Sequence, residues 1–298
     1  MSDTLLKNKI TRSVYKKMNA CLDEITLSVL RSTLSVFRST SKRFLDSKIK
    51  GFKHPEVFED EDMAEHFAHE YLGEIASQNV VKGYIISRIE FIENALGQDQ
   101  VSHDTFIDIG DPDGIFIKSL GKTELSANIS HIAANNVHKK GIESIRCDVE
   151  HLPLKTKSVD NILFFQIFEH LPNPISALHE LNRVAAKSII LSIPYVSKTN
   201  IHRYNYDPSR LIFEHHIFEF DDNDFRQVIT HTGLDIQHHE IVTVLTPVTF
   251  KEQIIFLFWN SRGVIRKDPE YGRIHDDLFY GCFKKFSIYH LTKKAMIP

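Results

Sequence analysis

The sequence contains little cysteine and no long apolar run. Its three cysteines are odd in number and lie far apart, so neither a disulfide framework nor a zinc knuckle is indicated, which fits a reducing cytosol. The longest apolar run, at residues 254–259, is far short of a bilayer span, and no apolar signal segment stands at the N-terminus. A net charge of −3 gives no general case for nucleic-acid binding. We therefore expect a soluble, cytoplasmic protein that does not bind nucleic acid.

Several binding and catalytic signatures are also missing. The chain has no Walker A loop, no exposed G-x-S-x-G motif and no G-x-G-x-x-G fingerprint of nicotinamide-binding folds. Its seventeen histidines include the pairs His215-His216 and His238-His239. Adjacent residues on a strand point to opposite faces, so neither pair chelates one metal by itself. Because no cysteine or acid stands at ligand spacing beside them, we expect no metal site.

From residue 101 onward the chain alternates between short apolar runs and helical segments, which is typical of an α/β sheet. The hydrophobic fraction of 42% and the charged fraction of 25% are those of an ordinary globular protein. The expected strands are 105–109, 123–128, 144–147, 159–165, 188–193, 234–245 and 286–291. Helices are expected from the N-cap Ser130 to Gly141, from about 174 to 184, and between Asp221 and Gly233.

The first hundred residues have a different character and a divided charge. Apolar residues recur there at spacings of three and four, which predicts an N-terminal helical region. Residues 1–53 carry twelve basic and four acidic side chains, a balance of +8, whereas residues 54–100 carry two and eleven, a balance of −9. Residues 5–50 could lie on an anionic membrane or on a partner. We favour the alternative that the two segments face each other, within the chain or across a homodimer.

The chain is organised around the stretch from Thr105 to Gly114. A short apolar strand containing Asp108 leads into a turn bounded by Gly110 and Gly114, and the next residues can open a helix. Strand, turn and helix form the first half of a βαβ unit, which brings a ligand against backbone N–H groups. Gly110 can adopt a positive φ, and Gly114 allows close approach of the backbone.

Polar groups also follow the next three expected strands. They are Asn128, Asp148 and Gln166, and in an open parallel sheet ligands bind beyond such strand ends. Together with the glycine turn they suit a ligand with a sugar, a heterocycle and a charged tail. Asn128 could bind ribose hydroxyls, Asp148 could accept a hydrogen bond from an exocyclic amine, and the backbone of Val149 could meet a ring nitrogen.

The motifs in this order resemble the class I S-adenosylmethionine-dependent methyltransferases, in particular their small-molecule, methyltransferase type 11-like group. The motifs are DIGDPDG (108–114), SANIS (126–130), CDVEHLPL (147–154), SVDNILFFQIFEHLPNP (158–174), ALHELNRV (177–184) and SIPY (192–195). The resemblance implies a Rossmann-like, seven-stranded sheet, mostly parallel, with helices on both faces and residues 286–291 as the antiparallel strand. It also implies a methyltransferase-like domain over residues 101–298, with an insertion at about 247–283, after the N-terminal helical region 1–100.

The resemblance further implies S-adenosylmethionine as the cofactor and a set of site residues. The expected cofactor-binding residues are Asp108, Gly110, Asp111, Gly114, Asn128, Ile129, Asp148, Val149 and Gln166. Asp108 and the two glycines match the motif that holds the methionine part, and Gln166 matches a residue near the transferred methyl. Glu169 and His170 match the EH pair. His170 is the candidate general base because its ordinary pKa lies near neutrality, although a role at the start of a helix is the reading we prefer.

Two positions depart from the family pattern. Pro112 replaces the middle glycine, which removes one N–H donor and fixes φ near −65°. Asn128 replaces the acid that usually binds both ribose hydroxyls, and a neutral amide binds hydroxyls more weakly than a carboxylate. We expect an enzyme that methylates a small or medium acceptor, such as a metabolite, a glycan or a lipid-linked intermediate. The alternative is a catalytically silent scaffold protein that uses the N-terminal helices as its interface.

Overall fold

The computed structural model describes residues 43, 46–53, 55–58, 78–196, 198–201, 216–243 and 285–294. Most of the basic segment 1–53 and the expected insertion at about 247–283 lie outside these residues. Within the described ranges, no helix is both long enough and apolar enough to cross a membrane.

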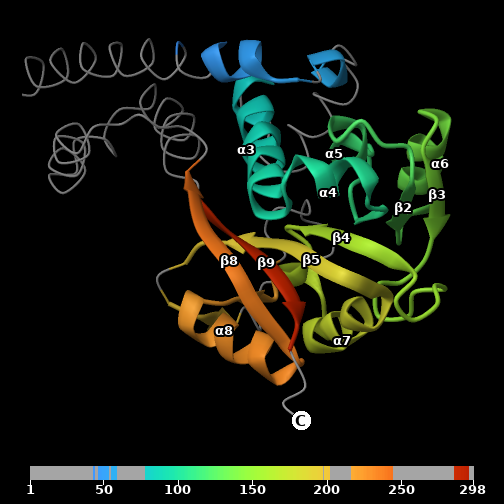
Figure 1. Cartoon of the computed structure of the whole chain (residues 1–298). Helices are drawn as coiled ribbons and strands as arrows, with labels where there is room; N and C mark the ends of the chain where they lie inside the picture. Colours follow the sequence, from blue (N-terminus) through green and yellow to red (C-terminus); the bar gives the residue numbers. More distant parts are fainter. Residues whose placement is uncertain are drawn as a thin grey trace, which may run out of the picture.

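A seven-stranded sheet forms the centre of the molecule (Figure 1). In spatial order its strands are β3 (Glu143–Arg146), β2 (Leu125–Asn128), β1 (Phe106–Ile109), β4 (Val159–Phe165), β5 (Ala185–Pro194), β9 (Lys285–Lys293) and β8 (Leu234–Thr243). The first five strands are mutually parallel, and β9 runs antiparallel to both of its neighbours, β5 and β8. The expected mostly parallel, Rossmann-like sheet is confirmed, with the last strand of the chain as the antiparallel one.

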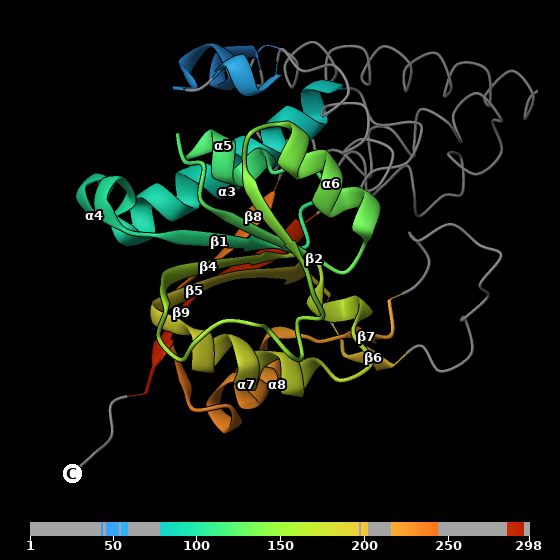
Figure 2. The same ribbon diagram turned by 90° about the vertical axis from the view of Figure 1, so that its right-hand side faces the viewer.

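Helices cover both faces of this sheet (Figure 2). On one side lie α3 (Gln78–Leu96), α5 (Ile115–Ser119) and α6 (His131–Lys139), and on the other lie α7 (Pro174–Val184) and α8 (Asp222–His231). The short helix α4 (Gln98–His103) leads into β1. Each face has its own apolar core, and β4 alternates between them: Leu163 and Phe165 pack on the α3 side, and Ile162 and Phe164 on the α7 side. This position explains why β4 is apolar along nearly its whole length.

The helix ends are fixed by local chemistry that the sequence predicts. The Ser130 side chain accepts a hydrogen bond from the backbone N–H of Ala133 at the start of α6. Asp221 accepts from the N–H groups of Asn223 and Asp224 at the start of α8. Pro174 occupies the first turn of α7, where its missing N–H has no intrahelical partner to lose.

The described fold also contains a small two-stranded sheet and two 3-10 turns. The strands β6 (Asn200–Ile201) and β7 (Phe218–Glu219) pair antiparallel, and the turns are η1 (Pro55–Phe58) and η2 (Phe168–His170). The backbone N–H of Ile217, just before β7, donates to the carbonyl oxygen of Glu169 in η2 at 2.7 Å. This bond places the segment around β7 at the C-terminal end of β4.

The oppositely charged N-terminal segments meet where the structure describes them. Lys48 and Lys53 of the basic segment form ion pairs with Glu90 and Glu93 of α3, with N–O distances of 2.5 and 3.1 Å. These contacts agree with the favoured interpretation that the two segments face each other, here within one chain.

Arg88 of α3 is the largest charged side chain in the core, with 0% of its surface exposed. Its guanidinium lies 3.5 Å from the ring centroid of Tyr84 and 4.5 Å from that of Phe286, and two of its nitrogens lie 3.4 Å from Ser192 Oγ. Aromatic faces attract a cation through their quadrupole. Arg88 therefore joins α3 to β5 and β9 by both packing and charge.

We expect Arg88→Ala to lower the free energy of unfolding by about 3–5 kcal/mol, because it removes buried packing and leaves the carboxyls around it without a balancing cation. Arg226→Ala is the matched control, since Arg226 forms a partly exposed pair with Asp222 in α8 and should cost about 1 kcal/mol at most. Urea unfolding of both variants measures the difference. Equal losses would contradict the role assigned to Arg88.

Candidate functional site

The turn after β1 is held by hydrogen bonds from its own residues. Gly110 and Gly114 have φ values of +90° and +67°, as the glycine positions require. The Asp111 carboxylate accepts hydrogen bonds from the backbone N–H groups of Asp113 at 3.0 Å and Phe116 at 3.2 Å. Burial raises the pKa of Asp111 to about 6, although these hydrogen bonds act in the opposite direction. Asp111, predicted to bind the cofactor, thus caps the first turn of α5.

The two glycines face tightly packed side chains. A Cβ added to Gly114 would lie 2.4 Å from Ile142 Cδ1, inside the core beneath α6. A Cβ added to Gly110 would lie 1.9 Å from Ile167 Cδ1, so the side chain of Ile167 rests directly on that glycine. Both positions therefore require glycine for φ, and Gly114, inside the core, requires it for space as well.

Asp108 has an unusual environment at the end of β1. It is 1% exposed, and neither carboxyl oxygen has a hydrogen-bond partner in the described part of the chain. Burial, followed by the neighbouring Asp111 carboxyl, raises its pKa well above the ordinary value, and the charge of Arg88 opposes this rise. A buried carboxyl without partners is costly to the fold. Asp108 is therefore suited to meet a cationic or hydrogen-donating group that comes from outside the chain.

Asn128, at the end of β2, contacts the same turn. Its Nδ2 donates to the Asp111 carbonyl oxygen at 2.9 Å and to Ser126 Oγ at 3.3 Å. The amide nitrogen thus has a structural partner, and its Oδ1 is the atom that can accept from a ribose hydroxyl. The next residue, Ile129, leaves 72% of its surface exposed beside this strand end.

The expected adenine-contacting residues lie at the end of β3. Cys147 N donates to the Asn128 carbonyl oxygen at 2.9 Å, which joins the ends of β3 and β2. Asp148 is exposed, and its Oδ1 accepts from Glu150 N at 3.0 Å in a local turn. Val149 is buried in the core, so its backbone, rather than its side chain, is the part that can meet a ligand.

Gln166 follows β4 and has a strained backbone. Its φ of +54° is uncommon for a residue other than glycine, and such strain is concentrated at functional sites. Its N–H donates to Ser192 O, and its Nε2 lies 3.4 Å from Ser192 Oγ. The end of β4 is thereby tied to β5.

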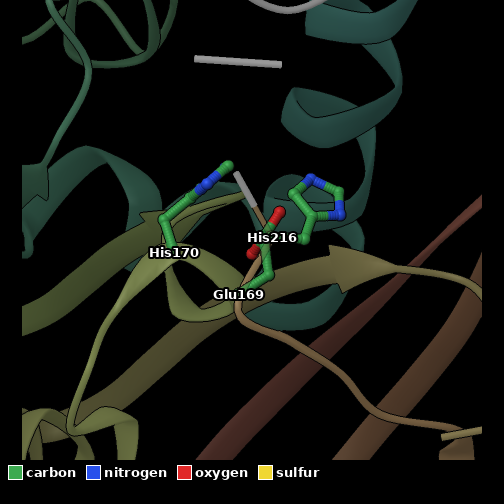
Figure 3. Close-up of side chains that lie close together, drawn as sticks. All are labelled: Glu169, His170 and His216. Carbon is green, nitrogen blue, oxygen red and sulfur yellow. The ribbon is translucent and has the colours of Figure 1, made fainter. Parts of the chain in front are cut away.

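Glu169, His170 and His216 lie close together beyond β4 (Figure 3). Glu169 is 1% exposed and its pKa is raised to about 7 by burial, against the opposing effects of its own backbone N–H, of His216 and of the Arg88 charge. His170 ends η2, where its ring packs edge-on against the ring of His216, with centroids 4.9 Å apart. Its role as a general base stays a prediction. The sequence assigned His216 no role in this site. It lies far along the chain from Glu169, and the hydrogen bond from Ile217 N to Glu169 O brings the two segments together.

The expected cofactor residues thus fall at neighbouring ends of β1, β2, β3 and β4. The sheet order places these four strands side by side, so their C-terminal ends form one edge. Asp108, Asn128 and Gln166 are buried there, whereas Asp148 and Ile129 are exposed. One buried carboxyl, one amide oxygen and one apolar surface suit the charged, ribose and heterocyclic parts of a nucleoside-bearing cation.

Comparison with known proteins finds a methyltransferase family and several structures of similar fold. Residues 107–192 match the family of methyltransferase domains. A candidate sarcosine dimethylglycine methyltransferase from Galdieria sulphuraria is similar in structure, with a TM-score of 0.50, 14% identity, and coverage of 80% of this chain and 99% of that one. The magnesium protoporphyrin IX methyltransferase from Synechocystis PCC 6803, solved with bound S-adenosylmethionine, has a TM-score of 0.47, 12% identity, and coverage of 72% and 82%. No protein among the curated sequences matches this chain.

The family match spans β1 to β5 and therefore includes the whole edge at which the expected cofactor residues gather. Residues 107–192 are, as the sequence predicts, those of a class I S-adenosylmethionine-dependent methyltransferase domain, with S-adenosylmethionine as its cofactor.

Proposed function

We propose that this protein transfers the methyl group of S-adenosylmethionine to a small or medium acceptor, which could be a metabolite, a glycan or a lipid-linked intermediate. The observation that carries the proposal is the buried Asp108 carboxyl, without a hydrogen-bond partner at the end of β1, beside the glycine turn of a methyltransferase domain. A carboxyl in that state suits a ligand that brings positive charge to it.

The residues of this edge fit the parts of the cofactor. Asp108 would hold the positively charged methionine end, Asn128 Oδ1 would accept from a ribose hydroxyl, and the side chain of Ile129 would lie against the adenine. Asp148 and the backbone of Val149 would meet the edge of the adenine. When bound, S-adenosylmethionine supplies a methyl group activated by a sulfonium.

Methyl transfer by in-line displacement depends mainly on holding the acceptor nucleophile in line with that methyl. Gln166 stands at the β4 end of the site, where its Nε2 lies 3.4 Å from Ser192 Oγ, and we assign it to the acceptor side. Because positioning suffices for many nucleophiles, His170 is not required as a base in this proposal.

A second function is favoured by one observation. Ile167 rests on Gly110 at the place where the methionine part would approach, and Pro112 offers no N–H. If Ile167 keeps this position, the domain is a silent scaffold that would use the N-terminal helical region, residues 1–100, as its interface.

Asp108→Asn separates cofactor binding from folding. The variant should bind S-adenosylmethionine about 10–100-fold more weakly, because a charge-assisted bond of roughly 1.5–3 kcal/mol is lost. It should also be more stable than the native protein by ~1 kcal/mol or more at alkaline pH, because a buried carboxylate is replaced by an amide that can donate to Asp111.

The pH dependence of stability follows from the raised pKa of Asp108. The stability contributed by a carboxyl with a raised folded-state pKa is complete below its unfolded pKa and is lost as pH rises through its folded pKa. The stability advantage of Asp108→Asn should therefore grow with pH. Calorimetric titration with S-adenosylmethionine and S-adenosylhomocysteine, together with urea unfolding at several pH values, measures both effects. If the variant and the native protein bound S-adenosylmethionine equally well, Asp108 would not be part of the binding site. If the native protein bound no cofactor, the scaffold hypothesis would be favoured.

Asn128→Asp restores the acid that the family usually has, yet we expect it to be harmful here. The substitution removes the Nδ2 donor to the Asp111 carbonyl and places a negative charge beside a turn already rich in buried acids. The free energy of unfolding should fall by about 1–3 kcal/mol at neutral pH, and cofactor affinity should not improve.

Asn135→Asp in α6 makes the same chemical change at an exposed position and serves as its control. Thermal unfolding and calorimetric titration of both variants test the prediction. A tighter-binding, fully stable Asn128→Asp protein would show that the turn does not depend on this amide.

A further inference from the structure

Three side chains of metal-binding type converge beyond β4. Glu169, His170 and His216 each offer one ligand atom, and these atoms lie within 4.8 Å of one another (Figure 3). Glu169 and His170 come from the turn η2, and His216 from the segment that precedes β7. The hydrogen bond from Ile217 N to Glu169 O joins these two segments. The cluster is therefore assembled by the fold rather than by sequence spacing.

Glu169 is the residue that points to a missing partner. Its side chain is 1% exposed, and neither Oε1 nor Oε2 has a hydrogen-bond partner among the described residues. Burying a carboxylate without hydrogen bonds is expensive, and a bound ion is one of the features that explain such a group in a native structure. A cation in contact with Glu169 would satisfy both oxygens.

His216 is oriented in the manner of a metal ligand. Its Nδ1 lies 2.6 Å from Glu219 Oε1 in β7. With Nδ1–H donating to this carboxylate, the lone pair of the neutral ring is on Nε2, which is the tautomer that binds a metal. Histidines that bind metals commonly donate their other nitrogen to a carboxylate in this way. Glu219 thus fixes both the tautomer and the orientation of the ring.

We propose that Glu169, His170 and His216 form a binding site for a divalent transition-metal cation of the Zn²⁺ class. Two imidazoles and one carboxylate are a ligand set that zinc uses where it keeps a further position open. Mg²⁺ and Ca²⁺ prefer oxygen ligands throughout, so the two histidines select against them. The bound cation would fasten η2 to the segment before β7. This proposal departs from the expectation of no metal site, which rested on the adjacent histidine pairs and on the lack of a cysteine or acid at ligand spacing beside them.

The proposal does not rest on methyl transfer, and it is tested without S-adenosylmethionine. The full chain, freed of metal by a chelator, is titrated with Co²⁺ while its visible absorption is followed, and Zn²⁺ is then used as competitor. We expect one Co²⁺ site per chain with the absorption of a low-coordinate ion, displacement by equimolar Zn²⁺, no displacement by Mg²⁺, and a rise in melting temperature on Zn²⁺ binding.

Variants identify the ligands. Glu169→Gln, which keeps the shape of the side chain and removes its buried charge, should fold and bind Co²⁺ at least tenfold more weakly, as should His216→Ala. Glu219→Gln should weaken binding about 10–100-fold through the orientation of His216. His138→Ala, on the exposed side of α6, is the matched control and should bind as the native chain does.

Two results would overturn the site. One is the absence of saturable Co²⁺ binding by the native chain. The other is unchanged affinity and spectrum in folded Glu169→Gln and His216→Ala proteins, which would assign the metal to other histidines. Circular dichroism of each variant establishes that it is folded before its affinity is compared.

Discussion

The hydrogen bonds that Asp111 makes within its own turn determine how this chain can meet a ligand. In a glycine-rich turn, the backbone N–H groups at the start of the following helix usually face an anionic part of the ligand. Here the Asp111 carboxylate accepts from the N–H of Phe116 in the first turn of α5 and from that of Asp113 in the turn itself, and Pro112 has no N–H. The turn therefore offers a ligand fewer donors than usual. We therefore expect the ligand to be bound mainly by side chains at the strand ends, above all Asp108 and Asn128, which suit cationic and hydroxyl-bearing groups.

The same edge of the sheet concentrates buried carboxyls. Asp108, Asp111, Asp113 and Glu169 are each at most 3% exposed. Asp111 is satisfied by backbone N–H groups and Asp113 pairs with Lys140, whereas Asp108 and Glu169 have no hydrogen-bond partner in the described chain. A fold that keeps such groups sacrifices stability at these positions, which is the usual sign of a site built for a ligand. The two carboxyls lie near the ends of the adjacent strands β1 and β4. In the two proposals above, the cationic cofactor would meet Asp108 and the metal ion would meet Glu169 beside it.

The sequence predicts correctly those helices and strands that are determined by their own residues and by the residues next to them. β4 and α7 have their expected bounds, because an apolar strand covered on both faces and a helix with proline in its first turn leave little freedom. β5 begins three residues earlier than expected, since Ala185 already pairs with Val159 of β4 as soon as α7 ends. The two-residue strand β7 has no pattern to detect. Its contact with η2 is tertiary, so the meeting of His216 with Glu169 could not be read from spacing.

The contribution of α3 shows why the site cannot be understood from residues 107–192 alone. Arg88, outside that stretch, lowers the pKa of both Asp108 and Glu169 through its charge. Its helix packs in the same core as β4 and β9, where Tyr84 contacts Phe286 with ring centroids 4.8 Å apart. The Arg88 cation on α3 thus lowers the free-energy cost of burying these two carboxyls without donating hydrogen bonds to them. The charge of Arg88 thus opposes the rise in pKa that burial causes at both carboxyls, and it favours the ionised form that would bind an incoming cation.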